Sequence, residues 1–119
     1  MGMVTFVDET TSGDASSAWA LEIAEERLTL REVIRRRIFQ EVAEHNARSQ
    51  GVFQGLVRPA GDSRRVDAER QFAQAVTAFG RNGFLVLVGE RQVEDLDAEI
   101  DLPYGTEVTF LKLVPLVGG

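Results

Sequence analysis

The residues at the end of the sequence offer the clearest chemistry. The printed chain closes on Pro115-Leu116-Val117-Gly118-Gly119. Because glycine has no Cβ, an extended Gly-Gly tail can thread a narrow enzyme channel that bulkier residues would block. The carboxylate of Gly119 would then be the reacting group. This pattern predicts a protein that is the substrate and carrier of another enzyme rather than a catalyst.

The content of cysteine and histidine restricts the chemistry that the rest of the chain could perform. There is no cysteine, which removes disulfides, thiolate metal ligands and a cysteine nucleophile together. The single histidine, His45, cannot build a histidine-based metal site alone and lacks the serine and aspartate context of a triad. It is expected to be partly buried near a helix end. With no phosphate loop either, we expect no catalytic residue, no metal and no bound cofactor, so an enzyme is disfavoured.

Length, composition and charge indicate one soluble domain. The 119 residues are 44% hydrophobic and 27% charged, which suits a single globular domain with a real core. The net charge of −6 argues against nucleic-acid binding, which depends on phosphate neutralisation, and favours partners with basic surfaces. Apolar runs are too short to span a membrane and no signal segment opens the chain, so a cytoplasmic location is expected.

Two charged runs can each be interpreted as a solvated surface or as a binding site. Arg35-Arg36-Arg37 would fan around a helix, so we expect solvated flanks rather than a nucleic-acid patch. The acidic residues between Glu94 and Asp101 indicate a solvated loop; the alternative is electrostatic steering toward a basic partner. Calcium binding is not expected, because the spacing and the central glycine of a calcium loop are missing.

Hydrophobic periodicity and turn residues predict strands around two helices. A capping box at Thr29 and Glu32 precedes a long helix from Leu30 to about Ala47, whose apolar row repeats every four residues. That row is Leu30, Ile34, Ile38 and Val42, and it would cross a sheet. The other expected elements are strands over 3–8, 19–23, 84–88, 91–93 and 106–114, a loop over 47–65, a helix over 66–79, and turns at 89–90 and 103–105.

The strand order and the C-terminal residues resemble the ubiquitin-like β-grasp family. Two segments resemble the C-terminal end of ubiquitin-like sulfur carriers, such as the small subunit of molybdopterin synthase, and of bacterial ubiquitin-like modifiers. They are Pro103-Tyr104-Gly105-Thr106-Glu107-Val108-Thr109-Phe110 and the tail from Val114. Residues 86–93 resemble the family's middle hairpin. The resemblance implies an α+β fold, a β-grasp mixed sheet crossed by one long helix. The single domain would span 1–119, with an inserted loop and second helix over about 48–82 and a reactive tail over 115–119.

In this family an E1-like enzyme uses ATP and magnesium to adenylate the terminal glycine. The resemblance therefore implies that Gly119 reacts, Gly118 gives a slim approach and Pro115 stiffens the exit from the last strand. Leu116 and Val117 would anchor the tail in the partner's groove. None of these residues would be catalytic, and no cofactor would be bound by this chain.

Three interpretations of the tail remain open at this point, two of which follow from that activation. A protein modifier would pass to an amine and form an isopeptide bond, with help from an E2-like enzyme and a deconjugating protease. A sulfur carrier of the molybdopterin or thiamine type would receive sulfur from a sulfurtransferase as a thiocarboxylate. The insertion favours the modifier, for which Lys112, the only lysine, would be the one internal linkage site. A non-covalent binding module with an incidental Gly-Gly is the third possibility.

Alternation along the last strand predicts a second functional surface. Val108 and Phe110 should point into the core, so that Thr109, Leu111 and Leu113 face outward. Exposed Leu111 and Leu113 beside the tail would form a partner-docking patch. The alternative is that the inserted helix covers both leucines.

Overall fold

A computed structural model of the chain describes residues 2–11, 17–48 and 66–113. These residues form an α+β structure with two compact units, Met1–Leu30 with Asn82–Gly119, and Arg31–Arg81, which are described separately below. The predicted single domain and the limits of its insertion stay predictions. In chain order the elements are β1 (Gly2–Thr10), β2 (Ser17–Ile23), β3 (Arg27–Thr29), α1 (Leu30–Arg48), α2 (Ala68–Gly80), β4 (Phe84–Val88), β5 (Arg91–Val93), β6 (Glu99–Asp101) and β7 (Glu107–Lys112).

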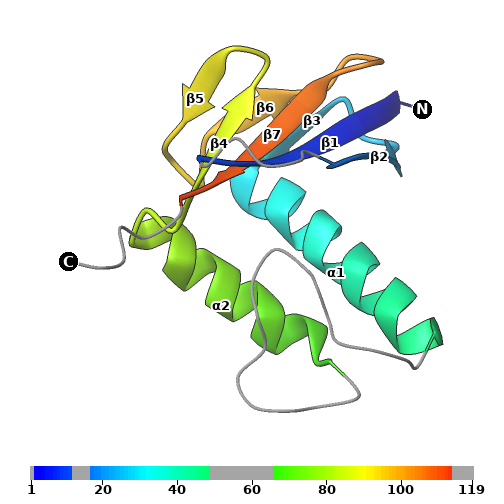
Figure 1. The fold of residues 1–119 in the computed structure, drawn as a ribbon. Coiled ribbons are helices and arrows are strands. Elements are labelled where there is room, and N and C mark those ends of the chain that lie inside the picture. The colour runs from blue at the N-terminus through cyan, green and yellow to red at the C-terminus, as the bar shows by residue number, and fades with distance from the viewer. Residues whose placement is uncertain (1, 12–16, 49–65, 114–119) are drawn as a thin grey trace. The chain divides into compact units, whose positions relative to one another are not determined.

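The first unit is built on a mixed five-stranded sheet in the order β2-β1-β7-β4-β5 (Figure 1). β1 and β2 form the predicted antiparallel hairpin. β7 runs parallel to β1 and antiparallel to β4, which places the last described strand in the middle of the sheet. β4 and β5 form the second predicted hairpin around the turn at Gly89. The sequence therefore predicted these strands, and the sheet order adds which of them are neighbours.

One face of this sheet carries large apolar side chains that are fully buried. Val4, Phe6, Val86, Val108 and Phe110 have no exposed surface. The ring of Phe6 makes edge-to-face contacts with Trp19 at 5.1 Å and with Phe110 at 5.6 Å between centroids. Such contacts add stabilisation beyond simple area burial, and here they link the adjacent strands β2, β1 and β7. The prediction that Val108 and Phe110 point into the core is confirmed.

A second, two-stranded sheet pairs β3 with β6. The interpretation of the acidic stretch as a loop throughout is therefore wrong, because Glu99–Asp101 is a strand. Arg27 Nε donates to Asp101 Oδ1 at 2.7 Å, and Ile100 between the two acidic residues is buried. The hydrogen bond to Asp101, with the charges of Asp101 and Glu99, raises the pKa of Arg27. A three-residue strand is too short to be seen as alternation in the sequence.

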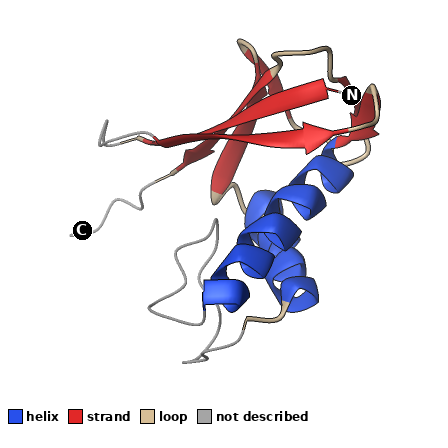
Figure 2. Cartoon of the chain, turned by 90° about the vertical axis from the view of Figure 1, so that its right-hand side faces the viewer, coloured by secondary structure: helices blue, strands red, loops and turns tan. Residues whose placement is uncertain are grey.

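The second unit contains the two helices, drawn blue in Figure 2. α1 begins where predicted and ends one residue beyond the predicted limit, and its apolar row is buried. α2 begins two residues later than predicted, because Val66 is held outside the helix by two 3.0 Å hydrogen bonds between its backbone and the Asn46 amide. Asp67 then caps the helix, with its carboxylate accepting from Glu69 N. Of the predicted loop, residues 49–65 lie outside the described residues.

Arg37 contradicts the expectation of a solvated arginine run. Its side chain is 0% exposed, and Nε donates to Glu41 Oε1 at 3.2 Å, whereas Arg35 and Arg36 are half-exposed. The reason is helical spacing: Arg37 follows Val33 by four residues and Ile34 by three, so it lies in the buried stripe. His45 lies in the same stripe and is buried, as predicted. Neither described helix has the length and apolar character needed to span a membrane.

Candidate functional site at the end of the last strand

The C-terminal end of β7 is held on both sides by backbone hydrogen bonds. Thr11 N donates to Lys112 O at 3.2 Å, and Leu113 N donates to Gly83 O at 3.1 Å. The chain is therefore fixed up to Leu113 within the first unit. The predicted tail residues Pro115, Leu116, Val117, Gly118 and Gly119 lie outside the described residues, so their roles stay predictions.

The start of β7 is set by the turn that carries part of the family resemblance. Thr106 donates to Pro103 O through both its backbone N, at 3.0 Å, and its Oγ1, at 2.6 Å. Gly105 has a φ of +85°, a left-handed conformation that a side chain disfavours, which explains glycine at this position. Gly105 N donates to Met3 O, which ties the turn to β1. The predicted turn is confirmed.

The face of the sheet opposite the buried phenylalanines has an apolar centre of intermediate exposure. In the ladders, Leu111 lies between Glu9 of β1 and Leu85 of β4, and Thr109 lies between Val7 and Leu87. Because cross-strand partners share a face, these side chains form one surface. We call it the Leu111 face and define its centre as Val7, Leu85, Leu87 and Leu111, all half-buried.

Two sequence predictions about this surface need correction. Thr109 is only 8% exposed rather than outward and open, because β7 is a central strand with Val7 and Leu87 on either side of it. Leu111 and Leu113 are half-buried instead of exposed. The sequence also missed Val7, Leu85 and Leu87 as members of the surface. Their alternation was visible, but which strands would be neighbours was not.

The charged strand residues described on the Leu111 face are all glutamates. Glu9 lies beside Leu111, Glu107 is two residues before Thr109, and Glu22 faces Met3 at the β2 side. All three are exposed. An apolar centre with an acidic border is complementary to a partner that has apolar contacts framed by basic residues.

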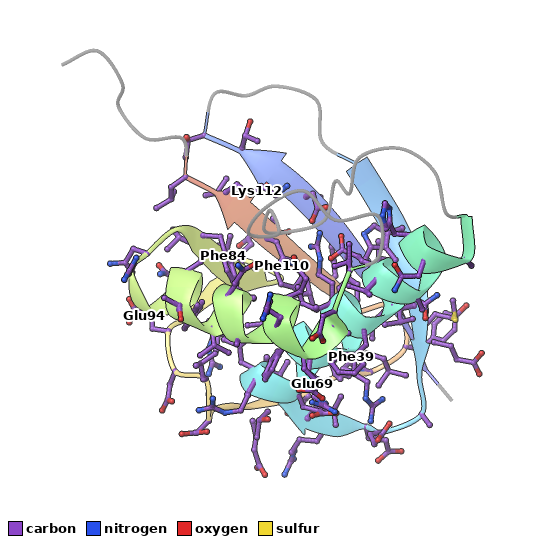
Figure 3. The ribbon with its side chains drawn as sticks, turned by 90° about the horizontal axis from the view of Figure 1, so that it is seen from below. Phe39, Glu69, Phe84, Glu94, Phe110 and Lys112 are labelled. Carbon is purple, nitrogen blue, oxygen red and sulfur yellow. The ribbon has the colours of Figure 1, made fainter. Side chains whose placement is uncertain are left out.

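Lys112 belongs to the other face of the sheet. It is the cross-strand partner of Phe84 and follows Phe110 by two residues, so its side chain leaves β7 on the side opposite Leu111. Figure 3 labels Phe84, Phe110 and Lys112 along these two strands. Lys112 is half-buried. An enzyme bound on the Leu111 face would therefore not cover this amine directly.

A hollow of about 360 Å³ lies at the opposite end of β7, beside the turn before Glu107. Its lining includes Glu25, Glu26, Asp101 and Tyr104, of which Tyr104 is 80% exposed. Among residues 2–11, 17–48 and 66–113, no group of three or more histidine, cysteine, aspartate or glutamate side chains is placed to hold a metal ion. The Leu111 face, and not this hollow, adjoins the exit of the chain from β7.

Comparison of the chain with models of known protein families, with curated proteins and with solved structures gives no match. The resemblance to ubiquitin-like carriers therefore rests on the sequence motifs described above.

Proposed function

We propose that the chain is a ubiquitin-like protein of the β-grasp type whose Gly119 carboxylate is adenylated by an E1-like enzyme and then conjugated to an amine. The observation that carries the proposal is the position of β7. It is the central strand, it lies parallel to β1, and the sequence that follows it leads to Gly118-Gly119. The proposal applies to a chain that carries its carboxylate on Gly119, whether by synthesis or after cleavage.

The sheet order supports the β-grasp assignment. An N-terminal hairpin, a last strand parallel to the first at the centre, and a second hairpin beyond it are compatible with that fold. A β-grasp domain also needs one long helix with a buried face, and α1 has a buried stripe from Leu30 to His45. The Gly105 turn at the start of β7 fits the family motif in sequence and has the conformation that requires glycine.

The chemistry needs no catalytic group from this chain. A carboxylate oxygen of Gly119 attacks the α-phosphorus of ATP, which is bound with magnesium by the activating enzyme, and pyrophosphate leaves. A nucleophile then attacks the glycyl carbonyl carbon, and AMP leaves. If the final nucleophile is an amine, it loses a proton and the product is an amide; if sulfur is delivered, the product is a thiocarboxylate. The chain contributes a slim tail and a surface on which the enzyme docks.

The Leu111 face supplies that docking surface in the proposal. Its half-buried apolar centre would gain contacts on binding, and its glutamates would favour a basic partner and speed the encounter. This assignment replaces the smaller patch of Leu111 and Leu113 with a surface drawn from three strands. A non-covalent binding module would use the same face but would not need Gly118-Gly119.

The test is conjugation in an extract of the source cells. The chain, tagged at its N-terminus, is incubated with extract, ATP and magnesium, and tagged products are analysed by intact mass and peptide sequencing. We expect ATP-dependent products that join Gly119 to lysine amines, and none with the chain lacking Gly118-Gly119. A thiocarboxylate on Gly119 would assign the sulfur carrier instead. Capture of partners by both chains equally, with no covalent product, would refute the proposal and favour the binding module.

A further inference from the structure

β2 is a long edge strand. It stands at one end of the strand order and pairs with β1 through seven residue pairs without interruption. Within the described part of the chain, no strand pairs with its other side. The opposite edge, β5, has only the three residues Arg91–Val93. The two edges therefore differ in how much backbone they leave open.

The backbone groups on the open side of β2 can be assigned from the neighbouring ladder. Thr5 N donates to Thr106 O at 2.8 Å and Met3 O accepts from Gly105 N, so odd-numbered residues of β1 direct their backbone groups toward β7. Even-numbered residues of β1 consequently direct theirs toward β2. Because hydrogen-bonded and non-hydrogen-bonded pairs alternate in an antiparallel ladder, Ala18, Ala20 and Glu22 turn their N–H and C=O groups to the open edge.

The residues of β2 itself carry little of the usual protection of a sheet edge against pairing. Natural sheets block long edges with lysine, proline, bulges or inward charges. β2 reads Ser-Ala-Trp-Ala-Leu-Glu-Ile, with one charge and no proline or glycine. Its register with β1 has no bulge, and Ala18 and Ala20 are exposed and small enough to let another backbone approach.

We propose that β2 is a self-association site, at which the β2 strands of two copies pair antiparallel about a twofold axis through Ala20 and join the two sheets edge to edge. This proposal does not depend on the chemistry of the tail. The sequence of β2 is complementary to itself in that register. Ala20 faces Ala20 of the second copy, Ala18 faces Glu22, and Trp19 faces Leu21.

Each of these pairings is favourable on physical grounds. The pairs of Ala18 with Glu22 and of Ala20 with Ala20 are hydrogen-bonded pairs, which satisfies every outward N–H of the three residues on both copies. Trp19 and Leu21 form a non-hydrogen-bonded pair, in which side chains come closer, and both are half-buried in one copy. No like charges oppose each other. Registers centred on Trp19 or Leu21 leave two residues of β2 without a partner.

Net charge and interface size determine how tightly the two copies are expected to associate. The chain carries −6, so two copies repel, and salt should tighten the association by screening. A single strand pair buries less surface than a standard stable interface, so the dissociation constant is expected on the order of micromolar or weaker. Association should therefore depend on concentration.

The absence of cysteine from the chain permits a test that reads the register. In Ala20→Cys, the two thiols of a dimer would lie on directly opposed residues, where Cα atoms are about 5.5 Å apart, within the range for a disulfide. Ala18→Cys is the matched control, because Ala18 opposes Glu22 and the two introduced thiols are far apart. Both full-length variants are oxidised gently, and covalent dimer is followed on non-reducing gels.

We expect Ala20→Cys to form covalent dimer at least about tenfold faster than Ala18→Cys, because only the first pair meets the geometric requirement. Equal rates for the two variants would overturn the proposal. The unmodified chain gives a second readout by sedimentation velocity. The proposal is supported if the dimer fraction grows with protein concentration and with salt. It also requires that the dimer is lost in Ala20→Lys but kept in Gln92→Lys, a change on β5. A monomer at every concentration, or equal loss in both lysine variants, contradicts it.

Discussion

Leu85 and Leu111 face each other across the β4–β7 ladder, and both are half-buried on the same side of the sheet. On its other flank Leu111 lies beside Glu9 of β1. The last strand therefore presents its leucine in the middle of an apolar surface with an acidic border, one residue before Lys112 and close to where the chain leaves the sheet. An activating enzyme that docks on this surface would therefore lie beside the point where the tail begins.

Leu111→Ala is expected to impair activation much more than folding. The few interface residues whose truncation costs more than about 1 kcal/mol of binding cluster near the centre of an interface, where the proposal puts Leu111, so the KM of the activating enzyme for the chain should rise by about tenfold. Leu21→Ala on the opposite face is the matched control, because Leu21 is also half-buried and loses the same atoms. Steady-state adenylation measures both. Similar KM values for the two variants would remove the Leu111 face from the proposed docking surface.

Lys112→Arg should leave activation unchanged and remove self-linkage through a side chain. Lys112 is the only lysine, and it leaves β7 on the face opposite Leu111. In a conjugation reaction with N-terminally blocked chain, we expect any product that joins two copies to be lost in the variant. Peptide sequencing of the cross-linked products identifies the acceptor. Copies still joined by an amide bond in Lys112→Arg would show that another nucleophile is used.

Gly105→Ala is expected to destabilise the first unit by about 1–2 kcal/mol, because the φ of +85° forces alanine into the left-handed region. Gly80→Ala is the control. A Cβ there would meet no atom within 4 Å, and alanine at a position whose conformation it can adopt stabilises by about 0.4–1 kcal/mol, because it reduces the entropy of the unfolded chain. Urea unfolding should therefore show opposite signs for the two variants. Destabilisation by both, or by neither, would contradict the turn geometry described here.

Glu41→Gln should cost about 3 kcal/mol of unfolding free energy, because it removes a charged partner from the guanidinium of Arg37, which is 0% exposed. Glu32→Gln is matched to it, since Glu32 accepts from Arg36 across the same helical spacing at 3.1 Å but both side chains are half-exposed. That change should cost less than about 1 kcal/mol. Urea denaturation compares them, and equal costs would mean that burial does not govern the Arg37–Glu41 pair.

The sequence predicted most elements because their signals are local. The apolar row of α1, the Phe84–Val88 strand and the Gly105 turn each depend on residues close together in the chain. The features that the sequence did not predict depend on contacts between residues far apart in the chain. β6 exists because it pairs with β3, and Val66 stays outside α2 because Asn46 binds it. The Leu111 face could not be drawn from the sequence, because alternation gives the side of a strand but not its neighbours.

Capture of the activated glycine tests the central proposal most directly. Hydroxylamine attacks an acyl-adenylate and leaves a hydroxamate on the carboxyl carbon, which intact mass and fragmentation locate. The chain ending at Gly119 is incubated with the activating enzyme, ATP, magnesium and hydroxylamine, beside the chain lacking Gly118-Gly119. We predict a hydroxamate on Gly119 that requires ATP and is absent from the shortened chain. Every E1-like enzyme of the source cells is tried, each beside a positive control in which it activates its own known substrate. If Gly119 stays unmodified with all of them, the proposed function is contradicted.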